Sequence, residues 1–108
     1  MQFETQADQG GVDHVKAFLD ELDTVIAKKV LTKLEHLSQC TYAQLMRSRH
    51  LKKVEGVLYE LRVPIGGDTF RFLGSIGEDV LWMVHAIKKK TQKLKRKDID
   101  LALRRINN

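Results

Sequence analysis

The sequence predicts an α+β domain in which an N-terminal helical hairpin packs on a small antiparallel sheet and a short helix ends the chain. Apolar residues recur every three or four positions between residues 12 and 37, which is the period of an amphipathic helix. Three runs of alternating apolar and polar residues follow between residues 57 and 87, separated by glycine-containing turns, as in an antiparallel meander. With 108 residues, of which 43% are apolar, the chain is expected to form one domain over residues 1–108.

The helical segment follows Gly10-Gly11, and Asp13 is suited to its N-cap or first turn. Asp23 and Thr24 predict a break that makes two helices, the second capped by one of these two residues. The apolar stripe consists of Val12, Val15, Phe18, Leu19, Leu22, Val25, Ile26, Val30, Leu34 and Leu37. Before it, the residues around Phe3 alternate and predict a short strand. After it, residues 38–49 lose the pattern and are expected to contain a loop.

The three strands are expected at residues 57–63, 70–76 and 80–87. Pro64 ends the first strand, and Gly66-Gly67 supplies the turn that follows. Centring that turn on the two glycines pairs Arg62 with Arg71. A three-residue turn at residues 77–79 pairs Ile76 with Val80, and therefore Arg71 with His85.

In this register one face of the sheet is apolar and needs the helices to cover it: Tyr59, Leu61, Val63, Phe70, Phe72, Trp82, Val84 and Ala86. The opposite face carries a row of Arg62, Arg71 and His85. A shift of one residue would bury the arginines among the aromatics, so the hydrophobic pattern favours this pairing. Because like charges that face each other across a sheet repel, the two arginines require a negative group, either Glu60 or a ligand phosphate.

Positive charge is concentrated in the C-terminal part of the chain. Residues 1–46 carry a net charge of −3 and residues 47–108 a net charge of +8. Such asymmetry is typical of a polyanion-binding surface, although a solvated basic surface gives the same pattern. The densest basic run, residues 88–97, holds Lys88, Lys89, Lys90, Lys93, Lys95, Arg96 and Lys97, and Lys52 and Lys53 lie just before the first strand of the meander. A short C-terminal helix then presents Ile99, Ala102, Leu103 and Ile106 as an apolar stripe.

Several kinds of site have little support. The four histidines (His14, His36, His50 and His85) show no metal-ligand spacing, so we expect no metal and no other cofactor. Cys40 is the single cysteine, which excludes an intrachain disulfide and favours a reducing compartment. The N-terminus has no signal-peptide pattern, and no apolar run is long enough to span a membrane, so a cytoplasmic protein is expected.

The arginines, lysines and histidine of the C-terminal part suit metal-free cleavage of RNA. This reaction needs proton transfer at a 2′-hydroxyl and at a 5′-oxygen, and it needs cations that stabilise the charge on the phosphate. The guanidinium fork of arginine binds two phosphate oxygens at once. The candidate catalytic residues are Arg62, Arg71, His85, Lys88 and Lys89. The candidate RNA-binding residues are Lys52, Lys53, Lys90, Lys93, Lys95, Arg96 and Lys97. A non-catalytic RNA-binding protein would carry the same cations.

Several segments together resemble the phage-derived branch of the RelE/HigB-like toxins. They are Leu-Tyr-Glu-Leu-Arg at residues 58–62, Phe-Arg at residues 70–71, and Val-His-Ala-Ile-Lys-Lys-Lys-Thr-Gln-Lys at residues 84–93. Residues 15–22 and 50–54 are also similar to that family, so the resemblance covers nearly the whole chain. It implies a RelE-like fold and a toxin of a type II toxin–antitoxin pair that cuts mRNA on the ribosome without a metal. It also implies a cognate antitoxin, often a helix-turn-helix protein.

By position, the resemblance gives Arg62 and Arg71 the role of contacting the phosphate. The sequence also departs from the family pattern. Phe70 stands where a tyrosine is usual, Ala86 replaces an aromatic residue, and no tyrosine follows Tyr59, so the acid and base are not identified. Two other functions therefore stay open: a ParE-like or degenerate toxin-fold protein that binds gyrase or a regulatory complex, and a plain RNA-binding protein.

Overall fold

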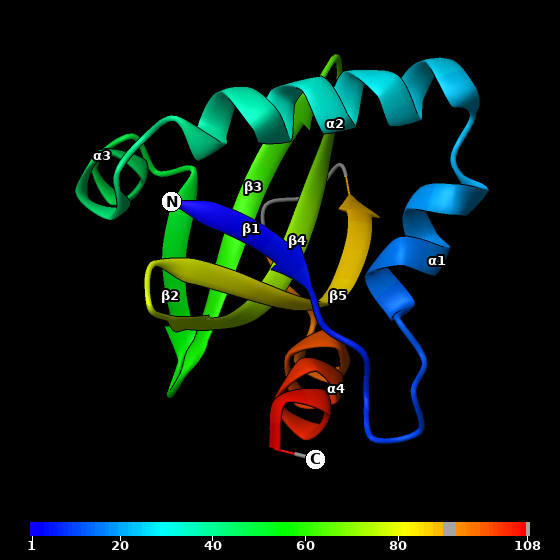
Figure 1. Ribbon diagram of the computed structural model, residues 1–108, viewed down its shortest axis with the longest axis vertical. Helices are drawn as coiled ribbons and strands as arrows, with labels where there is room; N and C mark the ends of the chain where they lie inside the picture. The colour runs from blue at the N-terminus through cyan, green and yellow to red at the C-terminus, as the bar shows by residue number, and fades with distance from the viewer. Residues whose placement is uncertain (90–92, 108) are drawn as a thin grey trace.

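The computed structural model describes residues 1–89 and 93–107 and has an α+β architecture (Figure 1). In the described residues, four helices and five strands alternate unevenly along the chain. They are β1 (Gln2–Thr5), α1 (His14–Glu21), α2 (Thr24–Ser38), α3 (Tyr42–Arg47), β2 (Leu51–Glu55), β3 (Leu58–Ile65), β4 (Asp68–Gly77), β5 (Val80–Lys89) and α4 (Arg96–Asn107). Three helices thus precede the central strands, and the fourth follows them. No helix among the described residues is long and apolar enough to cross a membrane.

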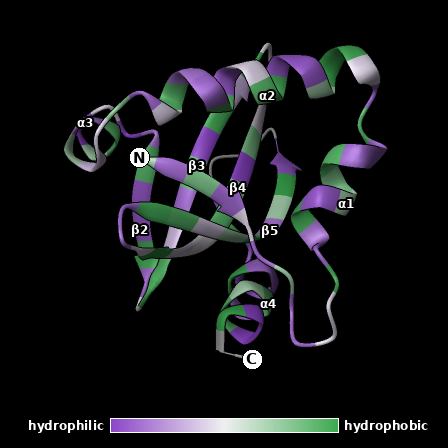
Figure 2. Ribbon diagram, viewed as in Figure 1, coloured by the Kyte–Doolittle hydropathy of each residue, from purple (hydrophilic) through white to green (hydrophobic). Residues whose placement is uncertain are grey.

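The break between the first two helices is confirmed. Asp13 caps α1 by accepting a hydrogen bond from the Lys16 amide at 2.9 Å, and Asp23 caps α2 by accepting one from the Val25 amide at 3.1 Å. The two helices pack on different strands of the sheet, which the expected hairpin did not specify. Helix α1 lies on β5, whereas α2 crosses β3 and β1 (Figure 1). In Figure 2 both helices show bands of hydrophobic and hydrophilic residues, as their period requires.

Two elements between α2 and β3 were not predicted. The expected loop at residues 38–49 contains α3, whose N-terminus has a reciprocal capping box between Thr41 and Gln44. Lys52 and Lys53 do not precede the sheet but lie within it, in the edge strand β2. With only two apolar residues among five, β2 lacks the alternation that identified the other strands.

The expected antiparallel meander forms the centre of a larger mixed sheet. Its strand order is β1-β5-β4-β3-β2, with β1 parallel to β5 and the other neighbours antiparallel. The short strand predicted around Phe3 is therefore present. Its parallel pairing was not predictable locally, because the two strands are joined through everything that lies between them in the sequence.

The first hairpin has the predicted register, and Arg62 pairs with Arg71. The second does not. The turn has two residues, Glu78 and Asp79, both with positive φ (53° and 62°), so Gly77 pairs with Val80. A β-bulge between Leu73 and Gly74 adds a further shift, and His85 pairs with Leu73. The predicted pairing of Arg71 with His85 is therefore wrong, since Ile87 lies opposite Arg71.

The turn and the bulge also change which β5 side chains face the main core. Leu81 and Met83 are buried with α1, α2 and the inner face of β3 and β4, whereas Trp82, expected there, is 38% exposed. Val84, also expected there, lies in a second core on the opposite face of the sheet. Helix α4 covers that second core with its predicted stripe. The buried residues of this second core are Leu58, Leu73, Val84 and Ala102, and the partly buried residues Val54, Leu94, Ile99, Leu103 and Ile106 pack around them.

Candidate nucleic-acid interface

The pair of strand arginines is joined by a buried carboxylate. Glu60 Oε1 accepts a hydrogen bond from Arg62 Nε at 2.7 Å, and Glu60 Oε2 accepts one from Arg71 Nη1 at 3.1 Å. Glu60 is 1% exposed and Arg71 is 2% exposed, but the side chain of Arg62 is 25% exposed. Of the two negative groups that the sequence allowed, the carboxylate is present. It fixes the orientation of Arg62, whose side chain stays partly open to solvent.

Arg62 lies in a cleft that we call the basic cleft. It consists of two hollows of about 320 and 240 Å³, both lined by Lys52, Lys53 and Arg62. The remaining lining residues are Met46, Arg49 and Leu51 in the first hollow, and Val54, Glu60, Lys93, Leu94 and Ile99 in the second. Strand β2 brings the lysines to this place, because Lys52 pairs with Glu60 and Lys53 pairs with Tyr59. Arg49 was not singled out from the sequence, since it precedes the strand pattern.

An aromatic pair lies beside Lys53. The rings of Tyr42 and Tyr59 meet edge to face at 6.1 Å between centroids, and their hydroxyl oxygens are 3.2 Å apart. The hydrogen bond to Tyr59 raises the pKa of Tyr42, while the charge of Lys53 opposes that change. Tyr42 is exposed and belongs to α3, the helix missed in the sequence. The capping residues Thr41 and Gln44 were the signal that could have placed it.

His85 lies away from the basic cleft in a polar cluster beneath α4. Its Nε2 donates a hydrogen bond to Asp98 Oδ1 at 3.0 Å, and its Nδ1 accepts one from Arg105 Nη1 at 3.1 Å. A guanidinium only donates, so this arrangement defines a neutral imidazole protonated at Nε2. Burial, aided by the charge of Arg105, lowers the pKa of His85 against the opposing effect of Asp98. Both ring nitrogens are thus engaged within the protein.

Asp98 also forms an ion pair with Lys89, whose Nζ lies 3.3 Å from Asp98 Oδ2. Although burial alone would raise the pKa of Asp98, the interactions with His85 and Lys89 lower it. Lys89 is therefore held between β5 and α4, whereas Lys88 is half-exposed and its Nζ lies 3.9 Å from Asp68 Oδ2. The two lysines that end β5 point to different surroundings.

The remaining predicted cations divide into two groups. Lys93, Lys95 and Lys97 are exposed. Arg96 is engaged, because it binds both carboxylate oxygens of Glu55 at 2.7 Å and Oδ1 of Asp100 at 2.9 Å, and these carboxylates raise its pKa. Lys90 lies outside the described residues. In the described ranges, no group of three or more His, Cys, Asp or Glu side chains is arranged to hold a metal ion.

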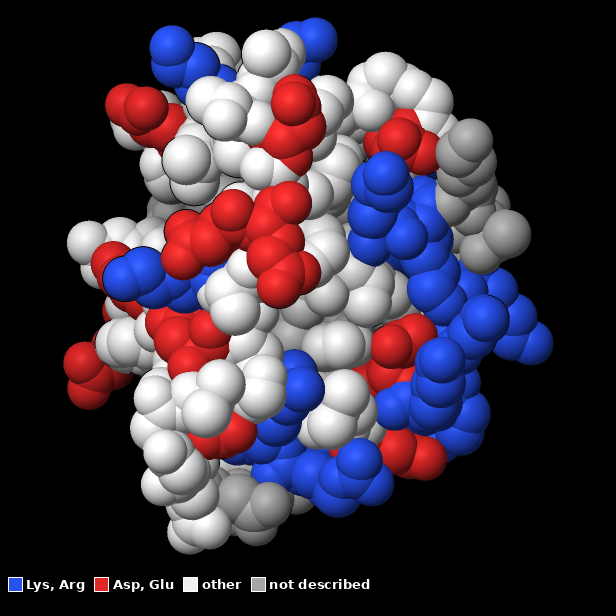
Figure 3. Space-filling view, turned by 90° about the vertical axis from the view of Figure 1, so that its right-hand side faces the viewer, with Lys and Arg blue, Asp and Glu red and all other residues white. Residues whose placement is uncertain are grey.

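Charge is unevenly distributed on the surface that Figure 3 presents. Lys and Arg side chains form a band along the right-hand side of that view, whereas Asp and Glu gather over its left half (Figure 3).

A family model identifies the chain over most of its length. The model described as phage-derived protein Gp49-like (DUF891) matches residues 17–107, a range that includes the basic cleft and α4. A comparison with curated proteins finds no match. The match covers more than half of the sequence, and the chain therefore belongs to the Gp49-like family of phage-derived proteins.

Proposed function

We propose that this protein is the toxin of a type II toxin–antitoxin pair, with a RelE-like fold, and that it cleaves mRNA on the ribosome without a metal. One observation carries the proposal: Arg62, held by the buried Glu60 and 25% exposed, lines the same cleft as Lys52 and Lys53. Membership of the Gp49-like family supports it, as does the resemblance of residues 58–62 and 84–93 to RelE/HigB-like toxins.

In this proposal Arg62 binds the scissile phosphate. Its Nε is occupied by Glu60, which leaves the terminal nitrogens to donate to phosphate oxygens and to stabilise charge in the transition state. Lys52 and Lys53 neutralise the flanking phosphates, and the exposed Lys93 extends the same surface. Arg71 is buried and has an indirect role, because it donates a hydrogen bond to the second carboxylate oxygen of Glu60 and so helps to position that side chain. Lys88 provides a further cation at the end of β5.

The proposed setting is the cytoplasm, where mRNA on translating ribosomes is the substrate. The proposed partner is a cognate antitoxin, such as a helix-turn-helix protein encoded beside the toxin. Both follow from the resemblance to type II toxins.

The test is controlled expression in a bacterial host. Wild-type protein should stop translation within minutes and produce new 5′ ends within mRNA coding sequence, mapped by primer extension. Arg62→Ala should abolish both effects, while Lys16→Ala, an exposed lysine on α1, should retain them. Growth and intact mRNA with the wild-type protein present and folded would refute the proposal.

A second function is favoured by the state of His85. This function is binding of RNA without cleavage. Both ring nitrogens of His85 are engaged by Asp98 and Arg105, so His85 is not free to exchange a proton with a substrate. A protein that only binds RNA needs no such proton transfer. Such a protein would shift RNA in a gel and leave it intact on ribosomes. A ParE-like action would instead appear as loss of gyrase supercoiling with no effect on mRNA.

A further inference from the structure

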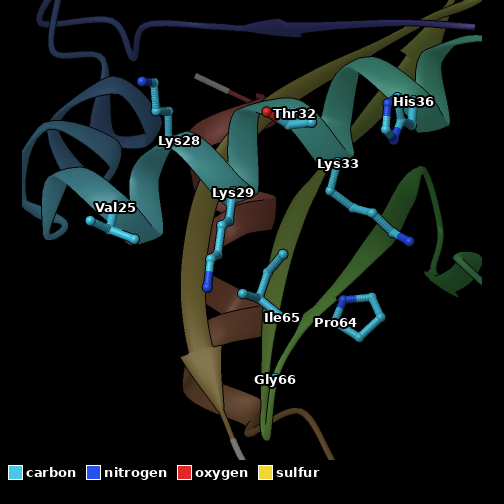
Figure 4. Close-up of a pocket in the computed structure, with 9 residues that line it drawn as sticks. All are labelled: Val25, Lys28, Lys29, Thr32, Lys33, His36, Pro64, Ile65 and Gly66. Atoms are coloured by element: carbon cyan, nitrogen blue, oxygen red, sulfur yellow. The ribbon is translucent and has the colours of Figure 1, made fainter.

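A further hollow lies between α2 and the turn that joins β3 to β4. Its volume is about 590 Å³, larger than either part of the basic cleft, with which it shares no residue. We call it the α2 groove. It is lined by Val25, Lys28, Lys29, Thr32, Lys33 and His36 from α2 and by Pro64, Ile65 and Gly66 from the end of β3 (Figure 4).

The α2 residues form one stripe. They recur at intervals of three or four positions from 25 to 36, so they share a face of the helix along three turns. At a rise of 1.5 Å per residue, this stripe is about 16 Å long. The groove is thus long enough for about three turns of a docked helix.

The groove combines an apolar floor with a basic rim. Val25 is 60% exposed, although it is a large aliphatic residue on the lining face, and Ile65 and Pro64 continue the apolar surface opposite it. In Figure 4, Lys29 extends across the space toward Ile65, and Lys33 extends above Pro64. Three lysines and one histidine line the groove, and no carboxylate is among the lining residues. The charge is therefore uncompensated within the groove.

This composition favours a protein ligand over a nucleic acid. Nucleic-acid surfaces use arginine forks and aromatic rings on which bases stack. The lining of the α2 groove has no arginine and no Phe, Tyr or Trp, and the imidazole of His36 is its one aromatic ring. Aliphatic contacts with a charged rim are instead the surroundings of an amphipathic helix that docks in a groove. Complementarity of charge then requires acidic residues on that helix.

We propose that the α2 groove binds an acidic amphipathic helix of a partner protein, whose aliphatic side chains contact Val25 and Ile65 and whose carboxylates pair with Lys29 and Lys33. The groove and the basic cleft have no residue in common, so the partner helix leaves Arg62 accessible. This inference does not depend on the RNA-cleaving activity proposed above.

The test uses ¹⁵N-labelled protein and a synthetic helical peptide of 14 residues with leucines at positions i, i+4, i+7 and i+11 flanked by glutamates. A matched peptide carries lysines in place of the glutamates, and a 12-nucleotide oligouridine serves as the nucleic-acid probe. The acidic peptide should shift the amide resonances of residues 25–36 and 64–66, whereas the basic peptide should not. Oligouridine should leave those resonances in place.

Variants then test the named residues. The double variant Lys29→Glu/Lys33→Glu should weaken the acidic peptide at least tenfold, and Val25→Ser about threefold. Lys16→Glu reverses an exposed charge on α1, outside the groove, and should bind as wild type does. Arg62→Ala should also bind normally, which separates this result from a failure of the proposed nuclease. The variants are at exposed or half-buried positions, and their unchanged spectra elsewhere would show that they fold.

Three results would overturn the inference. The first is an acidic peptide that causes no shift at residues 25–36. The second is oligouridine that shifts these residues as strongly as the peptide, which would make the groove a nucleic-acid surface. The third is a concentration-dependent shift of the same residues without any peptide, together with a dimer in sedimentation, which would assign the groove to a second copy of the chain.

Discussion

At the scale of single residues, Glu60 explains how two arginines can face each other across neighbouring strands. Arg62 and Arg71 are paired in the β3–β4 register, and each donates to a different oxygen of the same carboxylate. Without that carboxylate the positive charges would repel, and Arg71 would keep its charge at a site that is 2% exposed. The ion pairs of Glu60 are thus a condition for the position of Arg62 in the basic cleft.

Glu60→Gln should destabilise the protein, because it removes the negative charge between two arginines. Removing one partner from a buried ion pair costs about 3 kcal/mol, which should appear as a lower urea midpoint. Glu55→Gln is the matched control, since Glu55 pairs with Arg96 at an exposed site. It should have a much smaller effect. Equal losses for the two variants would contradict this account of Glu60.

Arg62→Lys should separate charge from geometry. Lysine keeps the positive charge but lacks the planar fork that contacts Glu60 and a phosphate at the same time. If the proposed cleavage occurs, its rate should fall about 100-fold, the effect of losing one transition-state donor. The measurement is the initial rate of mRNA cleavage on purified ribosome complexes. A variant as fast as wild type would show that the guanidinium has no specific role.

The folded protein should be less stable in mild acid than at neutral pH, because of the titration of His85. Its pKa is lowered in the folded state, so below its ordinary value of 6.5 the unfolded chain takes up more protons than the folded protein. The stabilisation is complete above that value and decreases as the pH falls toward the lower folded pKa. Urea unfolding at pH 7.5 and pH 5.5 measures the loss.

The comparison for this pH effect is His85→Gln, whose amide does not titrate and can still donate to Asp98. Its stability should change less between the two pH values than that of wild type. Burial and the charge of Lys33 also lower the pKa of His50, so part of the dependence should remain and should be removed by His50→Gln. A His85→Gln variant with the full wild-type pH dependence would exclude His85 as its source.

At the scale of elements, the turn at residues 78–79 and the bulge opposite Leu73 and Gly74, where Val84 is the extra residue on β5, decide what β5 presents to each side of the sheet. Gly74 has no side chain, and a Cβ there would overlap the backbone carbonyl of Trp82. The close approach of these two backbones permits the shift between Leu73 and Gly74. As a result Ala86 joins Met83 in the main core and His85 comes under α4.

Gly74→Ala should therefore disturb the whole β4–β5 pair. The overlap is with backbone atoms, which cannot rotate away, so a loss of about 3 kcal/mol in the free energy of unfolding is expected. Gly67→Ala is the control, since a Cβ there meets nothing within 4 Å and no positive φ is needed. It should be nearly neutral. Thermal unfolding of the two variants checks the difference, and a neutral Gly74→Ala would show that the bulge is not set by this glycine.

At the scale of the whole molecule, the topology gathers charge from distant segments. Strand β2 contributes Lys52 and Lys53, β3 contributes Arg62, and the segment before α4 contributes Lys93. The second hollow of the cleft lies on the side of the sheet that α4 covers, because Leu94 and Ile99 complete its wall. No acidic residue of the N-terminal part, residues 1–46, lines either half of this cleft.

Binding of single-stranded RNA to the basic cleft should depend on salt in proportion to the cations in contact. With Lys52, Lys53 and Arg62 each on one phosphate, the slope of log Kobs against log salt should be about −2, from about −0.7 per contact. Lys52→Gln or Lys53→Gln should each reduce the slope by about 0.7. Titrations with fluorescent oligouridine over a range of salt concentrations measure it. A slope unchanged in both variants would place the RNA elsewhere.

The sequence by itself determined the elements whose signals are local. Asp13 and Asp23 indicate where the two N-terminal helices begin. The alternation of residues 57–63 and 70–76 predicts a hairpin, and Gly66-Gly67 predicts its register. It also identified Glu60 as the acid available to the two strand arginines. These outcomes follow from capping, periodicity and turn chemistry, which involve residues close together in the chain.

Only the tertiary structure decided the rest, because it depends on backbones that approach from far apart. The two-residue turn at residues 78–79 placed Trp82 outside the core, and the turn and the bulge at Gly74 together moved His85 away from Arg71. Parallel pairing with β1 and the edge position of β2 are also long-range, and β2 is what carries Lys52 and Lys53 to Arg62. The sequence contained the cations of the basic cleft, but packing chose which of them share it.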